Sequence, residues 1–254
     1  MRNEYPGKFS SGYTFSTACS SSGHAILQAF QFIKSGMMEK AIVLGVDTHS
    51  CTTQIGFDSL KLVSQKGTKP LTVERDGLSL GEGGGILFLE GNPGRGRKIC
   101  GEICGAASSS DGYHISSPDP AGTEQIKCIM SSINEAGITP EDIDYINAHG
   151  TGTLMNDEVE MNAVSSVFGA YNPAVTSTKS FIGHTLGASA IDEIAIVLEM
   201  LKSNKIIQPK GFPAPMNAKL IPASTVGRQV KYFLKNSFGF GGNNVTLVVK
   251  NNIN

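Results

Sequence analysis

Cys19 is the first residue in this chain whose type and setting could support covalent chemistry. It stands in "STACSSSG", between a β-type run and the start of a helical pattern. A cysteine at a helix N-terminus lies beside free backbone N–H groups, which together with the helix dipole favour its thiolate. The alternative is an ordinary core cysteine, and "ACSSS" alone does not decide between the two.

Two histidines lie in comparable loops rich in Gly, Ser and Thr. His149 lies in "INAHGTGT", at the end of a predicted strand, and His184 lies in "STKSFIGHTLGAS", just ahead of a predicted helix. Strand ends in α/β sheets are where ligands bind. A lone histidine is more often structural, which is our interpretation of His24, His49 and His114. One cysteine with two such histidines would provide a nucleophile and two groups that move protons or stabilise an oxyanion.

The elements that must position these residues alternate between strand and helix. Strands are predicted at 40–47, 84–91 and 98–110, and helices at 21–35, 122–138 and 156–168. A short strand, a loop and a long helix follow from 173, and two strands joined by a glycine turn span 230–251. The run at 40–47 is continuously apolar, as in a strand covered on both faces. The alternation predicts an α/β layered fold with much parallel sheet.

Composition excludes several classes of protein. A net charge of −1 over 254 residues gives no broad electrostatic case for binding nucleic acid or an anionic membrane. No apolar run reaches the roughly 20 residues of a membrane helix, and the first residues lack the apolar core of a signal peptide. Five cysteines without a CxxC pair argue against a zinc site and fit a reducing cytoplasm. Cys100 and Cys104 are expected on one face of a strand, packed in the core.

The glycine-rich stretches resemble the β-ketoacyl-ACP synthase (condensing enzyme) family, elongating type, of the thiolase superfamily. "TACSSSG" looks like the nucleophile elbow of that family, and "PLTVERDGLSLGEGGGILFLE" is similar to its Arg-Asp-Gly…Gly-Glu-Gly segment. "NAHGTGTLMNDEVE", "STKSFIGHTLGAS" and "NSFGFGGNN" match the remaining blocks, in family order. The resemblance implies a thiolase-like layered fold (α-β-α-β-α). It also implies an acyltransferase, a 3-oxoacyl-[acyl-carrier-protein] synthase that performs a decarboxylative Claisen condensation with malonyl-ACP in fatty acid or polyene/polyketide biosynthesis.

The resemblance also gives each catalytic position a role. Cys19 would carry the acyl chain as a thioester, and His149 and His184 would support decarboxylation and stabilise the enolate. Lys179 would be their electrostatic partner, with Glu193 as its counter-charge.

The same resemblance assigns roles to the loops. The backbone N–H groups of Cys19 and Phe240 would form an oxyanion hole, and Phe240 would be the gate beside the cysteine. Thr151 and Thr153 would contact the pantetheine arm of an acyl carrier protein. No cofactor and no metal are implied, because the substrates arrive on phosphopantetheine.

The chain departs from the family pattern beside this set. "PLTVERDG" lacks the usual phenylalanine and first aspartate, and Asn243 replaces a common threonine. Ile191 and Asp192 stand in a helix that is normally richer in alanine and glycine. These differences bear on acyl-chain preference more than on reaction type.

The position of Cys19 is the larger departure. The family fold has two similar halves, and at ~30 residues per βαβ unit roughly 100 or more residues of the first half are expected to be absent here. We therefore expect residues 1–110 to be the remainder of the N-terminal half, carrying the elbow, and residues 111–254 to be the C-terminal half. The uncovered sheet should expose an apolar face and an edge.

Two functions of different classes stay open. The first is a condensing enzyme, working as a homodimer or as a heterodimer with another ketosynthase-type chain; the alternating run at 12–18 suits a dimer strand. The second is a truncated or split, inactive fragment that acts as a partner subunit of another ketosynthase. The chain-length partner subunits of the family lack the cysteine, so Cys19 favours the first. The Cys-His-His set likewise favours carrier-protein synthases over thiolases.

Overall fold

The computed structural model describes residues 11–94, 96–169, 171, 173–207 and 229–252. The helices are α1 (Ser21–Lys34), α2 (Cys51–Ser59), α3 (Thr123–Glu135), α4 (Leu154–Phe168), α5 (Lys179–Ile182) and α6 (Ser189–Lys202). The strands are β1 (Lys40–Asp47), β2 (Gly83–Glu90), β3 (Gly101–Ser110), β4 (Tyr145–Asn147), β5 (Ala174–Thr176), β6 (Tyr232–Gly239) and β7 (Asn243–Asn251). Single 3-10 turns are η1 (Pro140–Asp142), η2 (Leu186–Ala188) and η3 (Phe240–Gly242).

The larger sheet has five strands in the order β3-β7-β6-β4-β5. β3, β7 and β6 pair antiparallel, whereas β6, β4 and β5 pair parallel. Parallel strands end at the same edge of a sheet, so the loops that follow β4, β5 and β6 gather there. These are the loops that carry His149, Lys179 and Phe240.

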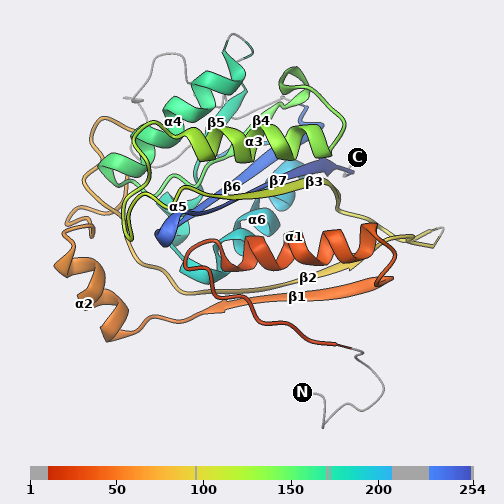
Figure 1. Ribbon diagram of the computed structural model, residues 1–254, viewed down its shortest axis with the longest axis horizontal. Helices are drawn as coiled ribbons and strands as arrows, with labels where there is room; N and C mark the ends of the chain where they lie inside the picture. Colours follow the sequence, from red (N-terminus) through yellow and green to blue (C-terminus); the bar gives the residue numbers. More distant parts are fainter. Residues whose placement is uncertain (1–10, 95, 170, 172, 208–228, 253–254) are drawn as a thin grey trace.

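The smaller sheet is the antiparallel pair β1–β2. Helices α1 and α6 lie between this pair and the five-stranded sheet, and α3 and α4 cover the other face of the larger sheet (Figure 1). The layers therefore follow the order sheet, helices, sheet, helices. The predicted boundary at residue 110 places β3 in the N-terminal half. In the structure β3 pairs with β7 in the larger sheet.

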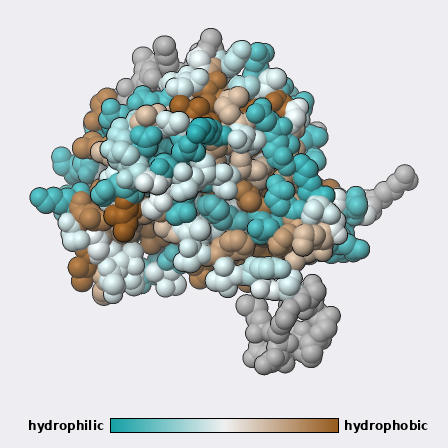
Figure 2. All heavy atoms as spheres, in the orientation of Figure 1, coloured by the Kyte–Doolittle hydropathy of each residue, from teal (hydrophilic) through white to brown (hydrophobic). Residues whose placement is uncertain are grey.

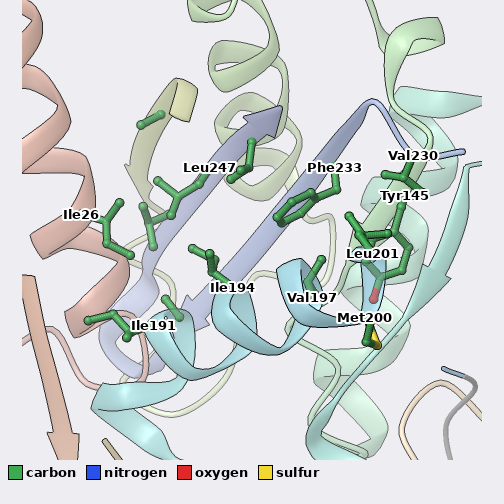
Figure 3. Packing of buried hydrophobic residues seen from close by; sticks show 14 of the residues in the cluster. Ile26, Tyr145, Ile191, Ile194, Val197, Met200, Leu201, Val230, Phe233 and Leu247 are labelled. Carbon is green, nitrogen blue, oxygen red and sulfur yellow. The ribbon is translucent and has the colours of Figure 1, made fainter. Parts of the chain in front are cut away.

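Helix α6 is fixed to the sheet by an apolar face with helical spacing. Ile191, Ile194 and Val197 point from α6 towards Phe233 of β6 and Leu247 of β7 (Figure 3). All five side chains are buried, and each such burial contributes about 1.5–3 kcal/mol relative to exposure. The polar residues near the start of α6 are thereby held in place.

The outer face of the β1–β2 pair is apolar and exposed, as the sequence predicted. Ile42, Leu44 and Val46 alternate along β1, and Ile86 and Phe88 lie opposite on β2; these side chains are between 48% and 71% exposed. The run at 40–47 predicted a strand covered on both faces. That prediction is wrong for β1, because the described residues cover only the face of the strand that is turned towards α1 and α6.

Self-association through this face is the expected result when residues 1–254 are expressed alone. Exposed apolar patches and unpaired sheet edges promote aggregation, so we expect weak solubility or a non-native oligomer. The double variant Val46→Lys/Ile86→Lys should lower the apparent mass in light scattering across a concentration series. Ile115→Lys, an exposed isoleucine outside the face, is the matched control. A monodisperse, thermally cooperative parent chain would contradict the expectation.

Three local features differ from the sequence predictions. Residues 12–18 form no strand beyond an isolated bridge between Thr17 and Cys19, because an extended run becomes a strand only beside a partner. Cys100 precedes β3 and is exposed, so its predicted core packing is wrong; Cys104 is half-buried at a bulge.

Helix α2 was not predicted, and none of its residues is buried. Apolar atoms gather at the left edge of the molecule in the region of α2 (Figure 2). Its N-terminus is capped by Ser50, whose hydroxyl accepts a hydrogen bond from the Thr53 N–H at 3.1 Å. A helix without a buried face leaves no periodic apolar signal in the sequence.

Candidate active site

Cys19 stands at a tight turn immediately before α1. Ala18 has φ = 51°, an uncommon and strained conformation for a residue with a Cβ. The Ser20 hydroxyl closes the turn by donating to the Thr17 carbonyl at 2.7 Å. A Cβ on Gly239 would lie 2.9 Å from that carbonyl oxygen, so a glycine lets the end of β6 approach the turn. The strain and the close packing present the sulfur to a pocket.

The Cys19 thiol is not the stabilised thiolate that its helix-start position predicted. Burial raises the pKa of the thiol to about 11. The Lys179 charge and hydrogen bonds from the backbone N–H groups of Phe240 and Cys19 lower this pKa, but by less than burial raises it. The sulfur is therefore protonated at neutral pH and must lose its proton as it attacks.

His149 and His184 lie side by side on the same pocket as Cys19. Their ring centroids are 5.2 Å apart at an interplanar angle of 80°, and both residues are buried. Burial lowers the pKa of each imidazole well below its usual value, and the Lys179 charge lowers it further. Both rings are therefore neutral, so each can donate one N–H.

The hydrogen bonds around His184 assign its donor atom. Its Nδ1 lies 3.0 Å from Ser189 Oγ, which itself accepts from the Thr185 hydroxyl at 3.4 Å. If the Ser189 hydroxyl donates to Nδ1, the ring hydrogen lies on Nε2, and this is the tautomer that we adopt. Within the described part of the chain Nε2 has no partner, so it is available to a ligand in the pocket.

The loop that carries His149 is held by a buried carboxylate. Glu160 of α4 accepts hydrogen bonds from the backbone N–H groups of His149 and Gly150, each at 2.8 Å. Gly150 has φ = 42°, and a Cβ there would lie 2.6 Å from the Ser177 side chain. Glycine is thus needed for the turn that points His149 inwards.

Lys179 forms the ion pair with Glu193 that was expected from the sequence. Their Nζ and Oε1 atoms are 2.5 Å apart, and both side chains are fully buried. The second oxygen of Glu193 pairs with Lys235 of β6. The charge that acts on the histidines is therefore part of a three-residue cluster.

Phe240 closes one side of the pocket. Its ring stacks on Phe57 of α2, with centroids 5.6 Å apart and planes at 30°. Gly241 and Gly242 follow it with φ of 77° and 74°, a conformation in which glycine is favoured. The role of Phe240 as a gate stays a prediction.

The pocket has a volume of about 260 Å³. Thr151 and Thr153 line it, with their hydroxyl oxygens 2.9 Å apart. In the described residues, no group of three or more His, Cys, Asp or Glu side chains is arranged to hold a metal ion. A nucleophilic sulfur beside two neutral imidazoles fits acyl transfer with stabilisation of an oxyanion.

Two models of one protein family match the chain. The beta-ketoacyl synthase N-terminal domain matches residues 11–93, and the beta-ketoacyl synthase C-terminal domain matches residues 100–211. Together they account for most of the chain. The chain belongs to the β-ketoacyl synthase family.

Named relatives agree with this assignment. A 3-oxoacyl-[acyl-carrier-protein] synthase 2 of Synechocystis sp. is 38% identical, over 92% of this chain and 60% of its own length. A ketosynthase solved in complex with its chain length factor, from Xenorhabdus doucetiae, has a TM-score of 0.83 at 34% identity, over 94% of this chain and 60% of its own. A structure of a type II PKS acyl-carrier protein in complex with its ketosynthase gives 0.90 at 28% identity, over 98% and 65%.

The match to these ketosynthases confirms the predicted layered α/β fold. The chain spans about 60% of the length of the curated relatives it matches. In the part of the chain that the structure describes, no helix is both long and apolar enough to cross a membrane.

The pocket brings together six of the residues singled out from the sequence. They are Cys19, His149, His184, Thr151, Thr153 and Phe240. Lys179 and Glu193 are buried and do not line the pocket. Sequence reasoning missed Glu160, Lys235 and Ser189. Both charged residues stand among other polar residues of their elements, so the sequence offered no signal that set them apart.

Proposed function

We propose that this chain carries the active site of a 3-oxoacyl-[acyl-carrier-protein] synthase. The supporting observation is the placement of Cys19 and two neutral histidines on one pocket, at the edge where the parallel strands end. The proposed reaction joins an acyl thioester on Cys19 to a malonyl thioester, with loss of CO₂.

The first step is transfer of the acyl chain to Cys19. The sulfur attacks the thioester carbonyl, and the oxyanion accepts hydrogen bonds from the backbone N–H groups of Cys19 and Phe240. The pantetheine sulfur then leaves and takes up the proton that the Cys19 thiol gives away. Because the thiol is protonated in the free site, this transfer needs no accumulated thiolate.

The second step forms the carbon–carbon bond. Loss of CO₂ from the malonyl group leaves its bonding electron pair as an enolate, with negative charge on the thioester oxygen. N–H groups of His149 and His184 stabilise this oxygen. The enolate carbon attacks the acyl carbonyl and expels the Cys19 thiolate, which takes up a proton before the next cycle.

The proposed substrates come on an acyl carrier protein. Thr151 and Thr153 present hydroxyls to the amides of a phosphopantetheine arm, and no cofactor or metal takes part in the proposed steps. One relative was solved with an acyl-carrier protein and another with a chain length factor. These support a carrier protein and a second ketosynthase-type chain, in a homodimer or heterodimer, as partners here, and we expect the protein in the cytoplasm.

A second candidate is an inactive subunit that serves another ketosynthase. The exposed apolar face of β1–β2 favours a protein that needs a partner. The presence of Cys19 and both pocket histidines favours the enzyme. The two candidates differ in whether Cys19 is acylated.

The test is a trapped acyl-enzyme. Protein purified from its own host, so that natural partners are retained, is mixed with an acyl-carrier thioester, quenched in acid and digested. We expect mass spectrometry to find the acyl adduct on Cys19. An adduct only on Cys51, Cys100, Cys104 or Cys128 would overturn the assignment, and no adduct at all would favour the inactive subunit.

A further inference from the structure

Lys235 is a fully buried lysine in the middle of β6. Its neighbours along the strand are Leu234 and Asn236, and all three are buried. The Lys235 ammonium pairs with Glu193 Oε2 and donates to the Asn236 carbonyl at 2.5 Å. A lysine is almost never fully buried unless it is paired, so the burial of Lys235 needs a physical explanation.

The Glu193 carboxylate is shared between two lysines. Its Oε1 pairs with Lys179 of α5 and its Oε2 with Lys235 of β6. Two ammonium groups on one carboxylate leave one positive charge in excess. Truncating either lysine would leave Glu193 with a free, buried oxygen.

A second carboxylate lies on the histidine side of the same cluster. Glu160 of α4 accepts the backbone N–H groups of His149 and Gly150, and also the Asn236 side-chain N–H at 3.2 Å. Its negative charge favours the charged form of Lys235. The cluster thus contains two lysines and two glutamates. Glu160 connects it to the histidine loop through its hydrogen bonds to the backbone of His149 and Gly150.

We propose that Lys235 is a positioning residue of this site: with Lys179 it fixes the Glu193 carboxylate, and its charge helps to keep both histidines neutral. The part that concerns catalysis rests on the proposed function, whereas the effect on the histidines does not. In this proposal Lys235 itself takes no part in making or breaking bonds.

The electrostatics of the site agree with this role. Apart from burial, the charges that lower the pKa of His184 are those of Lys179 and Lys235, and the pKa of His149 is lowered by these two and by His184. Burial lowers the pKa of Lys235 to about 8, although Glu193 and Glu160 oppose it. Lys235 is therefore mostly charged at neutral pH and loses its charge as the pH rises through about 8.

The test is a pH titration of the histidine ring signals by NMR, without substrate. The protein carries ¹³C-labelled histidine and keeps its natural partner chains, and the signals are assigned with His149→Gln and His184→Gln. Lys235→Met should raise the titration midpoints of His149 and His184 by on the order of one pH unit, the size expected when a nearby buried charge is removed. Lys231→Met, an exposed lysine just before β6, is the matched control and should leave them unchanged.

A second variant separates charge from packing. Lys235→Arg keeps the charge and should hold the midpoints near those of the parent protein. Unchanged midpoints in a folded Lys235→Met protein would overturn the proposal, and so would equal shifts in the Met and Arg variants. If Lys235→Met does not fold, the parent protein decides: its two ring signals should move by a small second step near pH 8, and a flat response there counts against Lys235.

An activity readout tells this proposal apart from the proposed function. In an active protein, Lys235→Met should move the acid limb of the decarboxylation pH profile upward, because imidazolium forms at a higher pH. If the parent protein decarboxylates nothing, the proposed function fails while the ring titrations still report on Lys235.

Discussion

Cys19→Gln is expected to abolish condensation while malonyl decarboxylation continues. The amide of glutamine cannot form a thioester, so the acyl chain has no carrier. Both histidines remain in the pocket and can still stabilise the enolate. Condensation should fall by roughly 10⁴-fold or more, as for the loss of a covalent nucleophile in other enzymes. The measurements are labelled CO₂ release and 3-oxoacyl product formation, each on protein purified with its natural partners.

Two further variants make this result specific. Cys19→Ser should also lose condensation, because a hydroxyl is a far weaker nucleophile than a thiol at this position. Cys51→Ser changes an exposed cysteine at the start of α2 and should behave as the parent protein. If Cys19→Gln lost decarboxylation as completely as condensation, the division of labour between the cysteine and the histidines would be wrong.

The sequence predicted the parts of the site that depend on local patterns. Cys19, His149 and His184 each stand where an apolar run of regular period gives way to small residues, and such breaks mark the ends of strands and helices. The parallel arrangement of β4, β5 and β6 brings the loops after β4 and β5, with the two histidines, to one edge of the sheet. The turn at Cys19 reaches the same edge by packing against Gly239 at the end of β6. Local pattern and topology therefore agree for the residues that face the pocket.

The supporting charges could not be predicted in this way. Lys235 lies in a strand whose pattern does not show which face is buried, and its partner Glu193 comes from a distant helix. Glu160 looks like any polar residue of a helix until its carboxylate is seen to hold the His149 loop. Long-range ion pairs of this kind have no periodic signature along the chain.

The state of Cys19 shows a different limit. The backbone N–H groups that lower the thiol pKa are those of Phe240 and of Cys19 itself, the two that the family resemblance implied, and not those of the first turn of α1. Burial has the larger effect and raises that pKa to about 11. Burial depends on packing against Gly239 and the pocket wall, which no short stretch of sequence can report.

Replacement of either pocket histidine by alanine is expected to slow decarboxylation by roughly 10²–10³-fold, the usual cost of removing one oxyanion donor. Acyl transfer to Cys19 should survive better, because its oxyanion is held by backbone N–H groups.

The same neutral histidines give a pH dependence with a defined sign. Their pKa values are lowered in the folded protein, so the stability that they contribute is fully present above the unfolded pKa of about 6.5 and is lost as the pH falls from there through the folded pKa values. Decarboxylation by the folded protein depends on the lowered folded pKa values, so its acid limb should lie at a pH well below 6.5.

The two histidines can be separated from each other and from a general loss of structure. Ser189→Ala removes the group that assigns the His184 tautomer, so it should reduce decarboxylation less than His184→Ala and leave the His149 titration in place. His49→Ala, an exposed histidine away from the pocket, should change neither rate. Single-turnover acylation measured beside CO₂ release decides the roles. A His184→Ala protein that decarboxylates normally but cannot be acylated would place His184 in the transfer step, and the assignment of both histidines to the enolate would then be wrong.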